Sequence, residues 1–239
     1  RDLHRLIRRQ RQMCIRDRLK TLNDMDVDHI TLIMPYFIYS RQDKVFRFGE
    51  PFSARYVLEL FRDYGIEKVF TVSSHMDRDR DMIQNSPIPV YNLNGYKALG
   101  RYFSKMDFHD PLVVSPDLTI TRAATQVADM IGSCEVFSIE KQRDKETGTL
   151  KSHGFVNAEG RDVIIIDDIL SSGGTIKNAI HSIQNAKSIY TGIVHAVSLP
   201  GINLISPLSN VLVSTDTVET PISQVSIITE IAEAVKSVI

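Results

Sequence analysis

The sequence predicts an α/β protein with mainly parallel sheets, and two observations support this fold class. First, short runs rich in β-branched residues alternate with helical periodicities from residue 20 onward, a pattern typical of βαβ units. Second, this alternation occurs in two series, which indicates two similar halves. A chain of 239 residues with 43% hydrophobic content is long enough to bury a core in each of two modest domains.

The first half is predicted to contain a strand, a helix and a second strand. Residues 31–34 form a buried-strand candidate. Ser53 is expected to cap the N-terminus of a helix with one apolar face, and Gly65 is the stop signal of this helix. Residues 68–72 form the next strand, which leads to His75.

The second half repeats this order of elements. Residues 112–114 are expected to form a strand, and residues 121–131 a helix that Gly132 ends. Residues 163–166, four β-branched side chains in a row, are typical of a fully buried strand. A helix over residues 176–184 is expected to follow.

Two domains are therefore predicted, residues 20–95 and residues 96–239, because turn-forming residues weaken the periodicity over residues 92–100. The polar segment 140–159 is expected to be an exposed mobile loop or hairpin, and such loops often close over substrates. Residues 225–239 are predicted to form an amphipathic helix that packs in the core, with a return onto the first domain as a further expectation.

Charge and cysteine content exclude several classes of protein. The formal net charge is −1, yet residues 1–20 carry eight Lys or Arg and two Asp. A basic arm that binds nucleic acid is one explanation. We favour a non-native or disordered tail over residues 1–19, because the chain lacks an initial Met and residues 12–18 resemble a translated sequencing adaptor.

Cys14 and Cys134 form no metal-binding CxxC pair, which fits a reducing cytoplasm. No apolar run reaches the ~18 residues of a membrane span, and no nucleic-acid or membrane partner is expected.

The strongest signal for chemistry is the segment 163–176, in which a buried strand leads through two carboxylates and a loop into a helix. Ligands of open α/β sheets bind beyond the carboxyl ends of strands, and a helix N-terminus attracts phosphate. Asp167 and Asp168 would repel phosphate, so we expect them to accept hydrogen bonds from ribose hydroxyls or to contact Mg²⁺. The loop combines small hydroxyl donors with permissive glycines: Ser171, Ser172, Gly173, Gly174 and Thr175. An ordinary turn is the plainer alternative, but the pattern predicts a phosphosugar site.

The segment 163–176 resembles the 5-phosphoribosyl-diphosphate loop that type I phosphoribosyltransferases share with ribose-phosphate pyrophosphokinases. Residues 35–44, with the sequence PYFIYSRQDK, are similar to a pattern that the pyrophosphokinases have and the transferases lack. The resemblance covers most of residues 20–239. It implies two type I phosphoribosyltransferase-like domains, the first of them incomplete, because residues 1–19 hold no counterpart of the family's early adenine-binding acidic loop.

The resemblance also implies roles for single residues. Arg41 and Gln42 would contact ATP, since an Arg clamps phosphate oxygens and a Gln reads a base edge or ribose. His75 would lie near the metal and the ATP phosphates, although Ser73 stands where the family has Asp. Asp117, in a Ser-Pro-Asp string, would bind Mg²⁺ together with His75.

Lys141 and Arg143 match the Lys-x-Arg of the family's flexible catalytic loop, where two cations would neutralise charge in the transition state. Residues 118–121 depart from the family, which commonly has Gly-Gly or Gly-Ala there. Residues 215–217 resemble a late structural strand.

The function that the resemblance implies is transfer of the β,γ-diphosphate of Mg-ATP to the 1-hydroxyl of ribose 5-phosphate. The products would be 5-phosphoribosyl 1-diphosphate and AMP, for nucleotide biosynthesis, with Mg²⁺ as cofactor and a homo-oligomer as the assembly. Ser73 and residues 118–121 leave open a catalytically silent regulatory subunit. A phosphoribosyltransferase is a further alternative, and no GxxxxGK[ST] string supports another mode of ATP binding.

Overall fold

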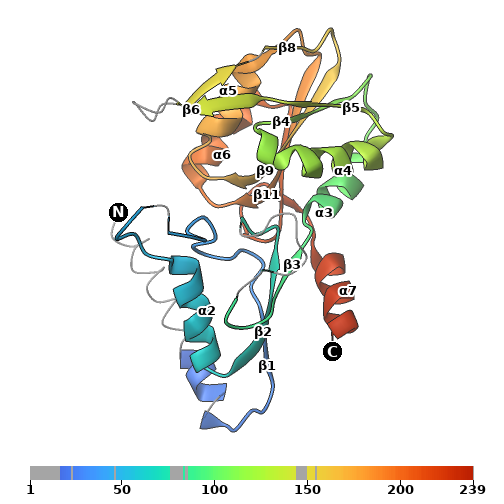
Figure 1. Ribbon diagram of the computed structural model, residues 1–239. Helices are drawn as coiled ribbons and strands as arrows, with labels where there is room; N and C mark the ends of the chain where they lie inside the picture. Colours follow the sequence, from blue (N-terminus) through green and yellow to red (C-terminus); the bar gives the residue numbers. More distant parts are fainter. Residues whose placement is uncertain are drawn as a thin grey trace. The chain divides into compact units, whose positions relative to one another are not determined.

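The structure, a computed structural model, divides into two units, Arg1–Asn92 and Leu93–Ile239 (Figure 1). It describes all parts of the chain but a few segments, and the side chains of residues 140–143 and 150–153 are not described. The described residues are 17–22, 24–45, 47–75, 83, 86–143, 150–153 and 155–238.

The first unit is a three-stranded sheet in the order β1-β2-β3 with a crossover helix, α2. Leu32 of β1 lies opposite Val69 of β2, and the two strands are parallel, so a helical crossover is needed to join them. The strands predicted at 31–34 and 68–72 are confirmed with small shifts of their ends. The bounds are β1 Ile30–Ile33, α2 Ser53–Asp63, β2 Ile66–Val72 and β3 Val90–Leu93.

The predicted capping role of Ser53 is wrong. The helix begins at Ser53, Phe52 occupies the cap position, and no side chain caps the first turn. The Ser53 hydroxyl instead donates a hydrogen bond to Oε1 of Gln42 at 3.2 Å. The predicted stop at Gly65 agrees with its left-handed φ of +77°, because glycine adopts this conformation without steric cost.

The core of the first unit lies between α2 and the sheet. Leu58 of α2 and Val69 of β2 are almost fully buried. Residues 17–22 are helical, and Leu19 is buried in the same cluster. This core therefore draws on side chains from before β1 as well as from the crossover unit.

The second unit is a parallel six-stranded sheet in the order β13-β12-β11-β9-β4-β5. Its strands are β4 Leu112–Ser115, β5 Glu135–Ser138, β9 Asp162–Leu170, β11 Ser188–Ala196, β12 Val211–Thr215 and β13 Ser223–Val225. Two small pairs stand apart, namely parallel β8 (Val156–Asn157) with β10 (Ile183–Gln184) and antiparallel β6 (Glu140–Arg143) with β7 (Leu150–His153). The helices are α3 Tyr96–Phe103, η1 Leu118–Ile120, α4 Thr121–Ile131, α5 Gly174–Ser182, α6 Leu199–Ile205, η2 Ser206–Leu208 and α7 Ile228–Val238.

The strand order reverses once in this sheet. From β4 the chain moves outward to β5, and it then returns to the other side of β4 and continues outward through β9, β11, β12 and β13. The reversal lies between β4 and β9. Such a topological switch point is the place where open α/β sheets bind their ligands, beyond the carboxyl ends of the strands.

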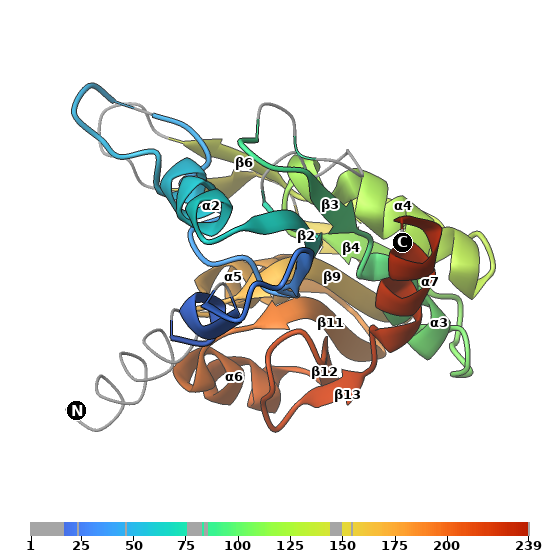
Figure 2. The same cartoon turned by 90° about the horizontal axis from the view of Figure 1, so that it is seen from below.

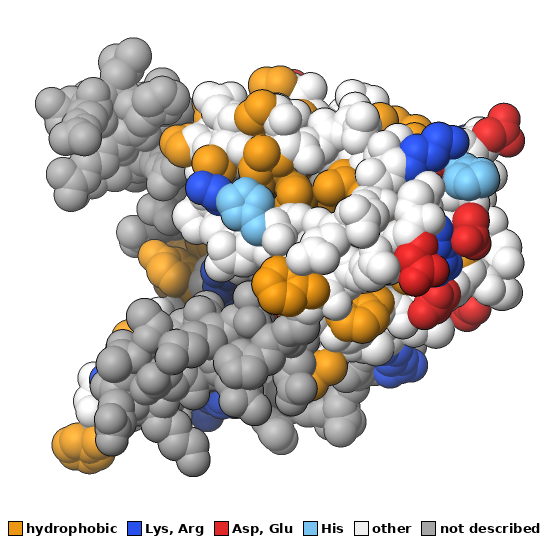
Figure 3. Space-filling view, turned by 90° about the horizontal axis from the view of Figure 1, so that it is seen from above, with side chains coloured by type: hydrophobic (Ala, Val, Ile, Leu, Met, Phe, Trp, Pro, Cys, Tyr) orange, Lys and Arg blue, Asp and Glu red, His pale blue; other side chains and the backbone are white. Residues whose placement is uncertain are grey.

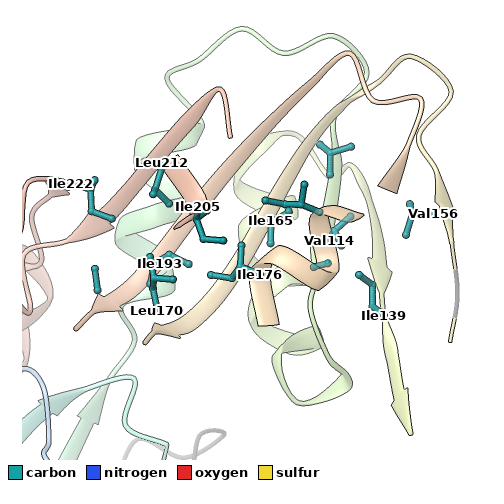
Figure 4. Packing of buried hydrophobic residues seen from close by; sticks show 14 of the residues in the cluster. Val114, Ile139, Val156, Ile165, Leu170, Ile176, Ile193, Ile205, Leu212 and Ile222 are labelled. Atoms are coloured by element: carbon teal, nitrogen blue, oxygen red, sulfur yellow. The ribbon is translucent and has the colours of Figure 1, made fainter. Parts of the chain in front are cut away.

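Helices cover both faces of this sheet, α5 and α6 on one side and α3 and α4 on the other (Figure 2). On the first side, Ile165 and Ile193 of the central strands pack with Ile176 of α5 and Ile205 of α6 (Figure 4). On the other side, Phe103 of α3 lies so close to Gly192 that a Cβ there would be 2.6 Å from the ring. Burial on both faces explains the unbroken apolar run over residues 163–166 of β9.

Most predicted elements of the second unit are confirmed. The helix at 121–131 has the predicted bounds. The strand predicted at 163–166 spans Asp162–Leu170, because its pairing with β11 continues past the two buried aspartates. The predicted end of the helix at 176–184 is wrong, because Ile183–Gln184 leave the helix and pair with β8. Helix α3 has no counterpart in the sequence prediction.

The final helix begins at Ile228, later than predicted, since Ser223–Val225 form a strand. Its Glu230 is buried and lies 2.5 Å from Nη2 of Arg101 on α3. This ion pair joins α7 to α3 within the second unit. The predicted packing of this helix against the first domain stays a prediction.

The helices and the surface of the described residues bear on membrane contact. Among the described residues no helix is long and apolar enough to cross a bilayer. Figure 3 shows hydrophobic side chains scattered on one face and acidic side chains gathered beside basic ones at its edge. Scattered apolar side chains are normal on a protein surface.

Candidate functional site

The carboxylates predicted to bind ribose lie at the carboxyl end of β9. Asp167 and Asp168 are each 4% exposed, and the backbone N–H of Asp168 donates to Oδ1 of Asp167 at 2.9 Å. Successive side chains of a strand point to opposite faces of the sheet. The two adjacent carboxylates therefore point to different sides of the strand end.

The loop after these carboxylates leads directly into α5. Ser171 and Ser172 are exposed, whereas Gly173 is buried. Gly173 occupies the helix cap position with a φ of +81°, a conformation that favours glycine. Gly174 and Thr175 form the first turn of the helix, where backbone N–H groups lack partners within the helix and attract anions. All five predicted loop residues thus lie at one strand–helix junction.

Asp117 lies at the carboxyl end of the neighbouring strand, β4. It caps the short helix η1, where its Oδ1 accepts hydrogen bonds from the backbone N–H of Thr119 at 3.0 Å and from the Thr119 hydroxyl. Residues 118–121, the departure from the family pattern, therefore form a helical turn that fixes the Asp117 side chain.

A cluster of three hydroxyl groups lies next to the carboxyl end of β4. The hydroxyl of the fully buried Ser115 donates to that of Ser138 at 2.8 Å, and Thr121 bonds the same Ser138 hydroxyl at 2.7 Å. This cluster joins the ends of β4 and β5 to the start of α4. The sequence analysis missed Ser138, because it lies outside every motif.

The electrostatics of the site couple the two strand ends. The pKa of the Asp167 carboxyl is raised well above its ordinary value, mainly by burial, then by the charge of Asp168 and, to a smaller degree, by that of Asp117. Burial and like charges both disfavour ionisation. Because β4 and β9 are parallel neighbours, their carboxyl ends bring Asp117 and Asp167 to the same edge of the sheet.

The carboxylates at this edge of the sheet suit a Mg²⁺ ion that is bound together with substrate phosphates. Among the described residues no group of three or more His, Cys, Asp or Glu side chains could hold a metal ion. Mg²⁺ keeps several waters and commonly uses one or two carboxylates plus substrate phosphates. Asp117 and Asp168 could supply such carboxylates. His75 belongs to the first unit, so its predicted pairing with Asp117 stays a prediction.

The predicted catalytic cations lie on a hairpin. Lys141 and Arg143 belong to β6, and their backbone partners in antiparallel β7 are Ser152 and Leu150. The expectation of a hairpin within 140–159 is thereby confirmed. Their side chains lie outside the described part of the structure, so their catalytic role stays a prediction.

The predicted ATP-binding residues Arg41 and Gln42 belong to the first unit, in the loop between β1 and α2. Gln42 donates its backbone N–H to Tyr39 at 2.8 Å, and its backbone carbonyl accepts from the N–H of Ala54 at 3.2 Å. With the Ser53 contact, both the backbone and the side-chain carbonyl of Gln42 are tied to the start of α2. Its side-chain amide is the group suited to donate to a ligand.

His75 follows β2 through an unusual turn. Ser73 has a φ of +39°, which is uncommon for a residue with a side chain. The buried N–H of Ser74 donates to Oδ1 of Asn92 at 2.8 Å. Asn92 therefore fixes the turn that precedes His75, whereas the sequence analysis read it only as a sign of a domain boundary.

Comparisons with family models show which class of protein domain the chain contains. Residues 91–200 match the family model of the phosphoribosyl transferase domain. Residues 13–65 match the model described as the N-terminal domain of ribose phosphate pyrophosphokinase. The second match includes part of the segment that the sequence analysis set apart as a tail.

Relatives and a solved structure then identify the family. A ribose-phosphate pyrophosphokinase of Thermococcus kodakarensis is 32% identical over 213 residues, which are 88% of this chain and 74% of the relative. That of Methanothermobacter thermautotrophicus is 30% identical over 91% of this chain and 76% of the relative. The crystal structure of phosphoribosylpyrophosphate synthetase from Mycobacterium smegmatis superimposes with a TM-score of 0.74 at 28% identity, covering 92% of this chain and 74% of that chain. The chain belongs to the ribose-phosphate pyrophosphokinase family.

Proposed function

We propose that this protein transfers the β,γ-diphosphate of Mg-ATP to the 1-hydroxyl of ribose 5-phosphate. The observation that carries the proposal is the switch point between β4 and β9. Asp117 follows one of these strands, while Asp167, Asp168 and the hydroxyl- and glycine-rich loop belong to the other. Sugar hydroxyls suit the carboxylates, and a sugar phosphate suits the loop and the helix N-terminus.

In the proposed reaction the 1-hydroxyl oxygen of ribose 5-phosphate attacks the β-phosphorus of ATP in line. The bond from that phosphorus to the oxygen shared with the α-phosphate breaks, AMP leaves with this oxygen, and the hydroxyl proton passes to solvent. A bound Mg²⁺ would neutralise phosphate charge. Positioning and charge neutralisation supply most of the catalysis in reactions of this kind.

The roles of individual residues follow this scheme. Ribose 5-phosphate is assigned to Asp167, Asp168 and the loop from Ser171 to Thr175. ATP is assigned to Arg41, Gln42 and His75, and Mg²⁺ to His75 and Asp117. Lys141 and Arg143 are assigned to stabilisation of the transition state. Self-association and a cytoplasmic location are predictions that accompany this proposal.

The test measures release of AMP from ATP and Mg²⁺ with and without ribose 5-phosphate. We expect AMP release that depends on the sugar phosphate, and we expect Asp168→Ala to weaken binding of ribose 5-phosphate. Asp129→Ala is the matched control, because this Asp lies on the exposed face of α4. Binding of ribose 5-phosphate without AMP release would support the silent subunit. Product formed from 5-phosphoribosyl 1-diphosphate and a base, without ATP, would support a phosphoribosyltransferase.

A further inference from the structure

The first turn of α6 packs against the loop that joins β9 to α5. A Cβ at Gly201 would be 2.0 Å from the carbonyl oxygen of Ser171 and 3.0 Å from its carbonyl carbon. Cβ atoms essentially never come closer than 3.0 Å to another heavy atom. The backbone of α6 therefore touches the backbone of the loop at a distance that only glycine permits.

The contact involves a glycine on each side. A Cβ at Gly173 of the loop would lie 3.3 Å from the carbonyl oxygen of Gly201 and 3.2 Å from Cδ2 of Leu204. In contrast, a Cβ at Gly174 would meet only the Ser172 hydroxyl, at the ordinary distance of 3.7 Å. The loop is thus closely packed on the side of α6, and its other side has room.

Helix α6 has little space to retreat, because its Ile202 and Ile205 are buried in the core of the second unit. The backbone N–H of Val197 donates to the carbonyl of Leu170 at 3.0 Å, which extends the β11–β9 pairing to the base of the loop. Behind the contact, Leu170, Ile176 and Ile205 belong to one buried cluster (Figure 4). Packed interiors have few voids into which a displaced segment could move. An added methyl group at Gly201 would therefore displace the loop.

We propose that Gly201 is a positioning residue for the loop from Ser171 to Thr175, and so for ribose 5-phosphate. It acts through the backbone of Ser171 and Gly173, since the absence of a side chain allows the loop to lie where its hydroxyl and N–H groups converge. This inference rests on the proposed function of the loop. A displacement of about 1 Å is enough to weaken a site that depends on oriented donors, by up to about a hundredfold.

The test is the variant Gly201→Ala in the full chain. We expect the affinity for ribose 5-phosphate, measured by calorimetry, to fall about tenfold or more, while the affinity for ATP changes by less than about twofold. A general loss of structure would instead lower both affinities. The matched control is Asn203→Ala, which alters an exposed residue of the same helix and should leave both affinities unchanged.

A second measurement reports on the loop without any ligand. Amide hydrogen exchange of the peptide that contains residues 171–175 should be faster in Gly201→Ala than in the wild type and unchanged in Asn203→Ala. Exchange in the first unit should stay the same in all three proteins. Equal exchange of the loop in the wild type and in Gly201→Ala would overturn the inference.

The outcomes separate this inference from the proposed function. If the wild type binds no ribose 5-phosphate, the proposed function fails, whatever the variants do. If the wild type and Gly201→Ala bind ribose 5-phosphate equally well, the proposed function stands and the positioning role is wrong. If Gly201→Ala does not fold, as judged by circular dichroism, Leu204→Ala replaces it, because Leu204 packs behind Gly173. We expect this milder change to lower the affinity for ribose 5-phosphate about threefold or more. Unchanged binding would overturn the inference.

Discussion

The two units hold their proposed binding residues by different means. In the second unit, β9 is buried along its whole length, and its loop lies against the backbone of α6 at Gly201. In the first unit, the turn before His75 includes a hydrogen bond from the backbone N–H of Ser74 to Oδ1 of Asn92. Close packing thus holds the loop proposed to bind the sugar phosphate, and a polar contact helps to hold the turn proposed to bind ATP.

The contrast indicates which kind of substitution should affect each unit most. Packed backbones cannot move independently, so a change of volume anywhere behind the loop reaches the loop. A single hydrogen bond can be removed with a smaller loss, which is limited to the group it leaves unpaired. Volume changes should therefore affect the second unit most, and loss of polar contacts should produce smaller, local effects.

The largest expected effect is on stability, from truncation of a buried side chain in the central strand. Ile165→Ala should lower the free energy of unfolding of the second unit by about 2–5 kcal/mol, because helices and strands on both sides prevent the cavity from collapsing. Leu58→Ala in α2 should cost the first unit less, since α2 packs on a sheet of only three described strands and can move toward the cavity. Hydrogen exchange of each unit measures the two costs. A larger cost for Leu58→Ala would contradict the comparison.

A smaller effect is expected from loss of the polar contact in the first unit. Asn92→Ala leaves the buried N–H of Ser74 without this acceptor, which should cost about 1–3 kcal/mol. Binding of ATP should weaken as well, because the turn carries His75, and calorimetry measures it. Asn92→Asp keeps an acceptor oxygen and should retain most of the ATP affinity. If Asn92→Ala binds ATP as well as the wild type, the turn does not depend on this contact.

The smallest effect should come from a polar contact within the packed unit. Thr119→Val removes the hydroxyl that Asp117 accepts from but keeps the backbone N–H bond, so stability should fall by no more than about 1 kcal/mol. The Mg²⁺ concentration for half-maximal AMP release should shift, because the carboxylate loses one restraint. Thr125→Val is the control, since that hydroxyl donates to the carbonyl of Thr121 in its own helix. A cost as large as that of Ile165→Ala would show that polar contacts and packing are not separable here.

The α/β class, the helix at 121–131 and the junction from Asp167 to Thr175 could be predicted from the amino-acid pattern alone. These features are local, since periodicity, β-branched runs and small loop residues act within a few positions of the chain. The resemblance to the family rested on equally short motifs, which is why it could be stated before any contact was known.

Other features became evident only from contacts in the folded chain. It showed that Ser53 bonds Gln42 and does not cap its helix, that Asn92 fixes the turn before His75, and that Gly201 lies against Ser171. It also set the end of α5, because Ile183 pairs with a strand that precedes it by many residues. Each of these relations joins atoms far apart in the sequence, and side-chain pattern carries no information on which distant backbone will occupy the space beside it. Close packing and hydrogen-bond partners are properties of the folded interior, whereas propensity is a property of the local chain.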